Sequence, residues 1–312
     1  MKTKSLIIAT ILAFLIFNSC TQQVQYKELR VLAWNIWHGG HSKAYPDVGC
    51  EGTINILKKS NADVILMIET YGAASMIADS LGFYYELLSS NLCIFSRYPI
   101  TEKYLFSNQI DPFNFGGVEI NIEGTRVRLF DTWLHYLPDA TKVPVEKTEY
   151  EIIAWEEEGT RDDELNAILT VMTPILKETD SIPVIMGGDF NSHSHLDWTL
   201  ATKDMYNHGG VVVNWPISKE MEAAGFTDSY REINPDPVTH PGVTWMYGPD
   251  ETAPNSWMDR IDYIYYQGRT IQAIDSKIYN QVLGEILLFE DEDFFYASDH
   301  GFVLTTFKIK SK

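Results

Sequence analysis

Short apolar runs, separated by polar or glycine-containing turns, recur along the chain from about residue 29 to residue 310. In the first third of the chain, strand-like runs alternate with segments of helical periodicity. The pattern predicts strands at Leu29–Asn35, Val64–Glu69 and Leu92–Phe95, with helices at Val48–Ser60 and Ala73–Leu81 between them. The domain therefore opens with alternating strands and helices.

The rest of the chain follows a different order. Val118–Ile122 and Arg126–Leu134 predict a hairpin that turns at Glu123-Gly124. Lys147–Leu176 predicts one or two outer helices, with Pro174 kinking or ending the last of them. Further strands are predicted at Pro183–Met186, Arg260–Tyr266, Ile271–Ile278 and Phe302–Ile309. This mixture predicts an α/β fold in which two mixed β-sheets pack together and helices flank them.

The N-terminal segment has the layout of a secretory signal rather than of a fold element. Lys2 and Lys4 precede an almost wholly apolar run from Leu6 to Phe17, which is too short for a permanent membrane span. We therefore expect residues 1–19 to be a signal peptide and the protein to be exported.

Cys20 follows this segment in a context similar to a bacterial lipoprotein signal, although Phe17 and Asn18 differ from the usual residues. We expect Cys20 to carry a lipid that anchors the protein in the cell envelope, with plain secretion or a periplasmic location as the alternative. Residues 20–28 are then a short tether, and residues 29–310 form one domain.

Composition and charge narrow the classes of partner. With 312 residues, of which 45% are hydrophobic, the chain can bury one large core. Its formal net charge of −19 repels polyanions and argues against tight nucleic-acid binding, although bound cations can invert the field locally. Cys50 and Cys93 can form a disulfide after export or remain buried thiols, and the sequence leaves both open.

Polar side chains that can bind metal or handle protons stand where apolar strands end. Asn35 and Glu69 close the first two strands, while Asp189 and Asn191 follow a strand that stops at Gly187-Gly188. A lone residue of this kind is more often a turn residue or a helix cap. Together they indicate a site, because binding and catalytic residues gather on the loops that follow a rigid sheet.

Two later motifs add a further acid and a base. Arg260-Ile261-Asp262-Tyr263-Ile264 places one carboxylate inside an apolar strand, where it needs a partner. Ser298-Asp299-His300 offers a carboxylate and an imidazole side by side. A buried Asp262 and His300 would satisfy each other, so we expect the two motifs to meet.

The Gly-Asp-Phe-Asn, Arg-Ile-Asp-Tyr-Ile and Ser-Asp-His motifs occur in this order, and with them the chain resembles the endonuclease/exonuclease/phosphatase superfamily. The resemblance covers essentially the whole chain after the signal segment. It implies a four-layer α/β sandwich of the DNase I-like type. It also implies hydrolysis of a phosphate ester that depends on Mg²⁺ or Mn²⁺.

The resemblance assigns the metal to three residues. Glu69 ligates the metal directly, and Asn35 lies beside it. Asp299 completes or positions the ligand shell. Oxygen ligands of this kind suit Mg²⁺.

The resemblance assigns the chemistry to four more residues. His300 is the catalytic histidine, oriented by Asp262 through its other ring nitrogen. Asp189 aligns or deprotonates the attacking water, and which residue is the true base stays open. Asn191 donates to a non-bridging phosphate oxygen and adds to the stabilisation of developing charge.

One position departs from the family pattern. Family members usually carry a Thr-His-Leu segment after the hairpin, whose histidine contacts the phosphate, and this chain has Trp133 there. His135 lies two residues further and faces the same side of an extended strand, so it either replaces that histidine or has a structural role. Four further histidines occur near the proposed site loops, at His38, His41, His193 and His195. We expect them to line the substrate site rather than to hold a transition metal, because Mg²⁺ sites use oxygen.

The function expected from these observations is hydrolysis of a small-molecule or lipid-linked phosphate ester by a monomeric phosphodiesterase or phosphatase. Membrane contact is expected only through the anchor at Cys20. A secreted nuclease that degrades extracellular DNA or RNA is the alternative within the same chemistry. A catalytically silent, surface-anchored binding module is the alternative of another class, suggested by the missing histidine.

Overall fold

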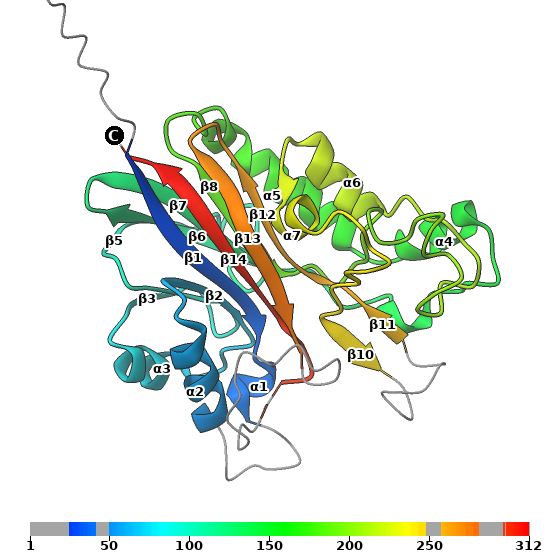
Figure 1. The fold of residues 1–312 in the computed structure, drawn as a ribbon, viewed down its shortest axis with the longest axis horizontal. Coiled ribbons are helices and arrows are strands. Elements are labelled where there is room, and N and C mark those ends of the chain that lie inside the picture. The colour runs from blue at the N-terminus through cyan, green and yellow to red at the C-terminus, as the bar shows by residue number, and fades with distance from the viewer. Residues whose placement is uncertain (1–24, 42–49, 248–256, 281–295, 297, 312) are drawn as a thin grey trace, which may run out of the picture.

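Two six-stranded β-sheets form the centre of the molecule in the computed structural model, which describes residues 25–41, 50–247, 257–280, 296 and 298–311 (Figure 1). The predicted signal segment and Cys20 lie outside the described residues. No helix within these ranges combines the length and the apolar character that a membrane span requires.

Sheet A has one parallel pair of strands among antiparallel neighbours. Its strands are, in spatial order, β13 (Ile271–Tyr279), β14 (Phe302–Lys310), β1 (Tyr26–Asn35), β2 (Val64–Ile68), β4 (Cys93–Ser96) and β3 (Tyr84–Leu87). β1 and β2 are parallel, and the other pairs are antiparallel. β1 begins at Tyr26 rather than at the predicted Leu29, because residues 26–28 pair with residues 308–310 of β14. These residues therefore belong to the domain and not to the predicted tether.

Sheet B repeats this arrangement. Its strands are, in spatial order, β5 (Ile100–Tyr104), β6 (Phe115–Ile122), β7 (Thr125–Trp133), β8 (Val184–Asp189), β12 (Asp262–Gln267) and β9 (Thr227–Asp228). β7 and β8 are parallel, and β6 and β7 form the predicted hairpin, turning at Glu123 and Gly124. A separate pair, β10 (Trp245–Tyr247) and β11 (Trp257–Asp259), precedes β12.

Helices cover the outer faces of both sheets, which gives the molecule four layers (Figure 1). α2 (Cys50–Ser60) and α3 (Ala74–Leu81) pack on sheet A in a buried cluster around Trp34. α5 (Arg161–Leu176) and α6 (Pro216–Ala223) pack on sheet B around Phe130. The remaining helical segments are α1 (Trp37–Gly40), the 3₁₀ turn Ala140–Lys142, α4 (Glu149–Glu156) and α7 (Ser229–Ile233). The predicted four-layer α/β sandwich is confirmed.

Strand alternation decides which side chains face the layer between the sheets. Along β1, Val31 and Ala33 belong to the cluster between the sheets, whereas Leu32 and Trp34 belong to the cluster under the helices. Successive strand residues point to opposite faces, so Asn35 continues the row of Val31 and Ala33. By the same rule, the inward-facing rows of β8 and β12 include Asp189 and Asp262. These two residues pair with each other, so they lie at the same end of sheet B.

The sequence pattern did not predict β3, β5, β9, α6 or α7. β3 and β5 are edge strands with mostly exposed residues, so they lack the apolar alternation that marks a half-buried strand. Pro174 lies inside α5, which ends at Leu176, so the proline falls in the last turn. Cys50 and Cys93 are both buried and free, and the disulfide alternative does not occur.

Candidate active site

The candidate site lies where the inner rows of β1, β8 and β12 meet at one end of the sandwich. On the inner face of β1, Asn35 lies two residues after Ala33. On the inner face of β8, Asp189 lies two residues after Gly187. The small residues let the two sheets approach closely here, because a Cβ atom on Gly187 would lie 2.8 Å from Leu66 Cδ1 and 3.2 Å from Ala33 Cβ. This close approach brings polar groups from both sheets within reach of one another.

Asp189, Asp262 and His300 form the buried part of the site. Asp189 and Asp262 are direct partners across the antiparallel strands β8 and β12. His300 Nδ1 lies 2.9 Å from Asp262 Oδ2, and His300 Nε2 lies 3.9 Å from Asp189 Oδ2. Among the described residues, these form the one group of three or more His, Cys, Asp or Glu side chains whose ligand atoms lie within 4.8 Å of one another. The predicted meeting of the two later motifs therefore occurs in the structure.

The charges of these three groups depend on one another. Burial and the neighbouring Asp262 carboxylate raise the pKa of Asp189. Burial alone would lower the pKa of His300, but the carboxylates of Asp262 and Asp189 outweigh it, so that the pKa of His300 is raised. His300 is therefore an imidazolium at neutral pH, with an N–H donor at each ring nitrogen.

Asn35 joins this group to Glu69. The Asn35 amide donates to Glu69 Oε1 at 3.3 Å and to Asp189 Oδ2 at 3.1 Å. Its own oxygen accepts from the Trp37 backbone N–H at 3.0 Å. Glu69 is half-buried, and its second carboxylate oxygen accepts from the His38 backbone N–H at 2.9 Å. We call Asn35, Glu69, Asp189, Asp262 and His300 the acidic centre.

The segment over Glu69 has a left-handed backbone. The four residues of α1 have φ values of 51°, 49°, 73° and 75°, from Trp37 to Gly40. Glu69 itself has a φ of 57°. Nine non-glycine residues in the described ranges have a positive φ, and five of them lie at this site: Trp37, His38, Glu69, Tyr71 and Asn191. Left-handed conformations of this kind cost energy and concentrate at functional sites, so their clustering supports a functional assignment.

The C-terminal segment is fixed to β1 by groups that the sequence did not indicate. The Ser298 hydroxyl donates to the Asn35 carbonyl at 2.6 Å and accepts from the His300 backbone N–H at 2.9 Å. The Trp34 indole N–H donates to the His300 carbonyl at 3.1 Å. The Thr244 hydroxyl accepts from the backbone N–H of Asp262 at 3.1 Å. These contacts join residues that are far apart in the sequence, so sequence motifs could not predict them. Only the serine of Ser-Asp-His belonged to a predicted motif.

A second set of buried charges fixes the start of β12. Arg260 is 1% exposed and donates to Asp197 at 3.0 Å and to Asp228 at 2.6 Å. Asp259 lies 2.9 Å from His193 Nδ1 and accepts from the Trp198 indole at 2.8 Å. His193 is therefore a partner of Asp259 rather than a member of the acidic centre.

Asn191 lies beside the acidic centre but is held by the backbone. Its N–H donates to Asp189 Oδ1, and its amide donates to the Leu134 carbonyl, both at 2.9 Å. The φ of Asn191 is 49°, so the segment after Asp189 is not the extended one that the sequence suggested. Phe190 between them packs in the cluster under α5 and α6.

Among the described residues, no hydrogen bond or ion pair joins the side chains of His135 or Asp299 to the acidic centre, although the charge of Asp299 contributes to the raised pKa of its neighbour His300. β7 ends at Trp133, so the strand rule does not reach His135, whose Nδ1 accepts from the Leu137 N–H at 3.2 Å. Asp299 is exposed. Trp133 is the Cα partner of Asp189 across the parallel strands β7 and β8, so the tryptophan takes the place that was expected of a histidine.

His38, His41 and His195 belong to no group of three or more potential metal ligands in the described ranges. His38 and His41 are exposed. His195 Nδ1 lies 2.8 Å from the Ser218 hydroxyl, at a cavity of about 460 Å³ between α6, β9 and α7. None of the residues of the acidic centre lines this cavity.

Comparison with known proteins identifies the family. A model described as "Endonuclease/Exonuclease/phosphatase family" matches residues 32–300, which include the whole acidic centre. The chain belongs to this family. The resemblance noted in the sequence is thereby confirmed, and the fold is that of the family's phosphoesterases.

The chain is also similar to individual proteins over most of its length. An uncharacterised protein of Caenorhabditis elegans, F14F9.5, is 29% identical over 275 residues, which are 81% of this chain and 84% of that protein. A D. rerio TDP2 structure, complexed with single-strand DNA product, is 17% identical with a TM-score of 0.59 and covers 90% of this chain and 98% of its own. ANGEL2, a 2′,3′-cyclic phosphatase in complex with adenosine-2′,3′-vanadate, is 14% identical with a TM-score of 0.55 and covers 92% and 99%. At these identities the two structures establish the fold.

Enzymes of this family generally depend on a divalent metal ion, and the residues of the acidic centre fit one. Glu69 presents a half-buried carboxylate, and within the described part of the chain its oxygens accept from the Asn35 amide and the His38 N–H. Asp262 Oδ1 is buried and has no hydrogen-bond partner among the residues that the structure describes. Carboxylate oxygens are the protein ligands that Mg²⁺ and Mn²⁺ prefer.

Proposed function

We propose that this family member is an exported, Mg²⁺- or Mn²⁺-dependent hydrolase of phosphate esters. The observation that carries the proposal is the continuity of the acidic centre. A single amide, that of Asn35, contacts both the half-buried carboxylate of Glu69 and the buried Asp189, which faces the Asp262 and His300 pair. Glu69 would ligate the metal, Asn35 beside it would position the Glu69 and Asp189 carboxylates, and the exposed Asp299 is a further candidate ligand.

The metal, when bound, would neutralise charge on the phosphate and its leaving group. Asp189 would take a proton from the attacking water at Oδ2, because its raised pKa makes it a better proton acceptor than an ordinary aspartate. His300 cannot be that base while it is an imidazolium, so its Nε2–H would donate to a phosphate oxygen. Asp262 holds Nδ1 and thereby fixes the ring.

The test is a substrate panel of phosphomonoesters, phosphodiesters and supercoiled plasmid, with Mg²⁺, Mn²⁺ or a chelator. Glu69→Gln and Asp189→Asn are expected to lower kcat by about a hundredfold or more, since each removes a group used in the transition state. Glu222→Gln is the matched control, because Glu222 is a half-exposed carboxylate on α6 outside the acidic centre.

Three results contradict parts of the proposal. Near-full activity of Glu69→Gln rejects the metal assignment. Plasmid nicking at rates far above those of small esters favours the nuclease alternative, although the net charge of −19 argues against it. No turnover with any ester or metal favours the silent binding module.

Metal binding is also measurable without turnover. A ligand that binds only the folded state raises the melting temperature, so Mg²⁺ is expected to raise Tm for the wild type and for Glu222→Gln. Glu69→Gln is expected to lose that rise. An equal rise in all three proteins places the ion elsewhere.

We also propose that the chain is anchored in the cell envelope by a lipid on Cys20. The support is the sequence of the N-terminal segment alone. Cys20→Ser is expected to move the protein from the membrane fraction to the soluble exported fraction and to abolish labelling with radioactive palmitate. Unchanged membrane association of the variant would reject the anchor.

A further inference from the structure

Aromatic side chains flank the acidic centre on the side of α1. The ring centroids of Trp37 and His38 lie 5.3 Å apart, and those of His38 and Tyr71 lie 6.0 Å apart. We call these three residues the turn group. His38 is exposed, Tyr71 is 41% exposed and Trp37 is half-buried, so the group meets solvent.

The turn group is held directly against Glu69. The N–H groups of His38 and Gly39 donate to the Glu69 side chain and carbonyl, at 2.9 Å and 2.8 Å. Trp37, His38 and Tyr71 all have positive φ values. Non-glycine residues avoid this conformation, and its clustering in three aromatic residues beside the Glu69 carboxylate supports a functional role for their position.

A second aromatic group lies at the end of β7. The rings of Phe113 and Trp133 meet edge to face at a centroid distance of 5.6 Å, and Tyr136 lies 6.4 Å from Trp133. We call these three residues the strand group. Trp133 is half-buried and Tyr136 is 53% exposed.

Trp133 has a fixed position beside Asp189. It is the Cα partner of Asp189, and Asn114 clamps its backbone with hydrogen bonds of 2.9 Å and 3.0 Å. Its side chain also packs against the cluster between the sheets, on the same inner row as Leu129. The indole therefore reaches the end of the inter-sheet layer, where the acidic centre lies.

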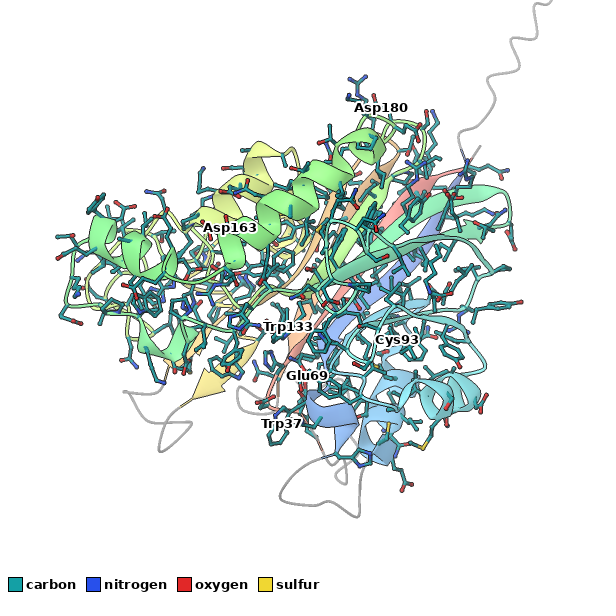
Figure 2. All side chains as sticks on the ribbon, turned by 180° about the vertical axis from the view of Figure 1, so that it is seen from behind. Trp37, Glu69, Cys93, Trp133, Asp163 and Asp180 are labelled. Carbon is teal, nitrogen blue, oxygen red and sulfur yellow. The ribbon has the colours of Figure 1, made fainter. Side chains whose placement is uncertain are left out.

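The two groups lie on either side of the acidic centre. The turn group contacts Glu69, the strand group borders Asp189, and the Asn35 amide spans the two carboxylates. In the view of Figure 2, Glu69 lies between Trp37 and Trp133. A phosphate held at the acidic centre would thus have aromatic surface next to its ester substituent.

We propose that Trp133 and the turn group form an aromatic subsite that binds a planar ring carried by the phosphate ester next to the bond that is cleaved. The inference rests on the proposed function for the ester, and it adds the class of its substituent. Aromatic faces bind flat rings by stacking and edge contacts, whereas an indole offers a phosphate a single weakly placed donor. Trp133, in place of the family's histidine, would therefore bind the substituent of the ester rather than its phosphate. The strongly acidic chain favours a single aromatic ester over a polyanion.

The experiment compares benzyl, cyclohexylmethyl and methyl phosphate esters, whose leaving alcohols have similar acidity, so that differences report binding rather than leaving-group ability. The wild type is expected to prefer the benzyl ester in kcat/KM by about tenfold or more over the methyl ester, the range of one stacked ring. Trp133→Ala is expected to lose most of this preference, and Trp133→Phe to keep it. Trp133→His is expected to lose it as well, because an imidazole is a smaller surface.

Two controls separate the subsite from other effects. Tyr84→Ala removes an exposed aromatic residue at the start of β3. Tyr84 pairs with Ser96, which in turn pairs with Val64 at the end of β2 that is far from Glu69, so all rates are expected to stay unchanged. Calorimetry with benzylphosphonate and methylphosphonate in the presence of Mg²⁺ measures binding without turnover. Wild-type protein is expected to bind the benzyl compound more tightly, and Trp133→Ala to bind both equally.

The outcomes distinguish this inference from the proposed function. Turnover of all three esters at similar kcat/KM, unchanged in Trp133→Ala, overturns the aromatic subsite and leaves the hydrolase intact. Absence of turnover with preserved benzylphosphonate selectivity overturns the hydrolase and supports the subsite. A preference for the cyclohexylmethyl ester equal to that for the benzyl ester shows a general apolar surface and also overturns the ring-specific inference.

Discussion

Asp189 and Asp262 lie directly opposite each other on neighbouring antiparallel strands, and each is 1% exposed. Like charges in such positions destabilise a sheet, and burial increases the repulsion. The imidazolium of His300, which contacts both, offsets it. The two carboxylates therefore repel each other inside the protein, and the His300 cation reduces that repulsion.

Removal of that cation is expected to destabilise the protein. His300→Gln is expected to lower the free energy of unfolding by about 3–5 kcal/mol, the usual cost of removing one partner of a buried ion pair. Asp262→Asn in the same chain is expected to restore part of the loss, because it removes the unpaired charge. Urea unfolding of the two single variants and the double variant measures this coupling, and strictly additive effects would refute it.

Gly188 is expected to tolerate no side chain. Its φ is 142°, and a Cβ atom would lie 2.0 Å from the Thr132 carbonyl oxygen, which belongs to the backbone of β7. Gly188→Ala is expected to cost about 3 kcal/mol or more and to displace Asp189. Gly124 also has a positive φ but has no atom within 4 Å of a Cβ position, so Gly124→Ala is expected to cost only about 1 kcal/mol. Thermal unfolding of both variants checks this, and equal costs would show that backbone conformation alone decides.

The His193 and Asp259 pair predicts a pH dependence of stability. Burial lowers the pKa of His193, but Asp259 outweighs it and raises that pKa, with Glu156 adding to the effect. The contribution of His193 is thus complete below its ordinary pKa of about 6.5 and is lost as the pH rises through the higher folded value. His193→Gln is expected to remove this loss, which sets in above about pH 6.5.

Asp259, the partner of His193, has a pKa that is shifted in the opposite direction. Burial raises the pKa of Asp259, but His193 and His208 outweigh it and lower that pKa. Asp259 therefore contributes above its ordinary pKa of about 3.9, and this contribution disappears on acidification. The difference in unfolding free energy between wild type and His193→Gln, measured from pH 4 to pH 9, is expected to shrink at the alkaline end. A difference that grows there would contradict the assignment.

The two buried thiols are expected to be unreactive in the folded protein. Burial raises the pKa of Cys50 to about 11 and raises the pKa of Cys93 as well, so neither is a thiolate at neutral pH. In a Cys20→Ser background, Ellman's reagent is expected to detect no fast thiol before urea is added and two afterwards. Rapid labelling of the folded protein would show that α2 opens readily.

Local pattern was enough to find the residues that lie at strand ends. Asn35, Asp189 and Asp262 continue the inner rows of their strands, and those rows can be read from alternating apolar residues. His300 was found in the Ser-Asp-His motif, and its pairing with Asp262 was predicted because a buried carboxylate needs a partner. The sequence thus predicted most of the acidic centre, together with both sheets and their helical layers.

The rest of the site depends on backbone conformation and on contacts between distant segments. The left-handed turn from Trp37 to Gly40 has no sequence signature except its two glycines. Ser298 and Trp34 act through the carbonyls of Asn35 and His300, which alternation cannot reveal. For His135, the prediction assumed that the strand continues, whereas it ends at Trp133.

The direction of β1 determines how an anchored molecule would stand on its membrane. β1 starts at Tyr26, beside the C-terminal end of β14, and finishes at Asn35 of the acidic centre, so these two residues are about 30 Å apart at the usual rise of a strand (Figure 1). A lipid upstream of Tyr26 would place the start of β1 toward the membrane and the acidic centre on the side of the domain that faces away from it. This orientation favours dissolved phosphate esters as substrates over the lipid headgroups of the membrane that holds the anchor.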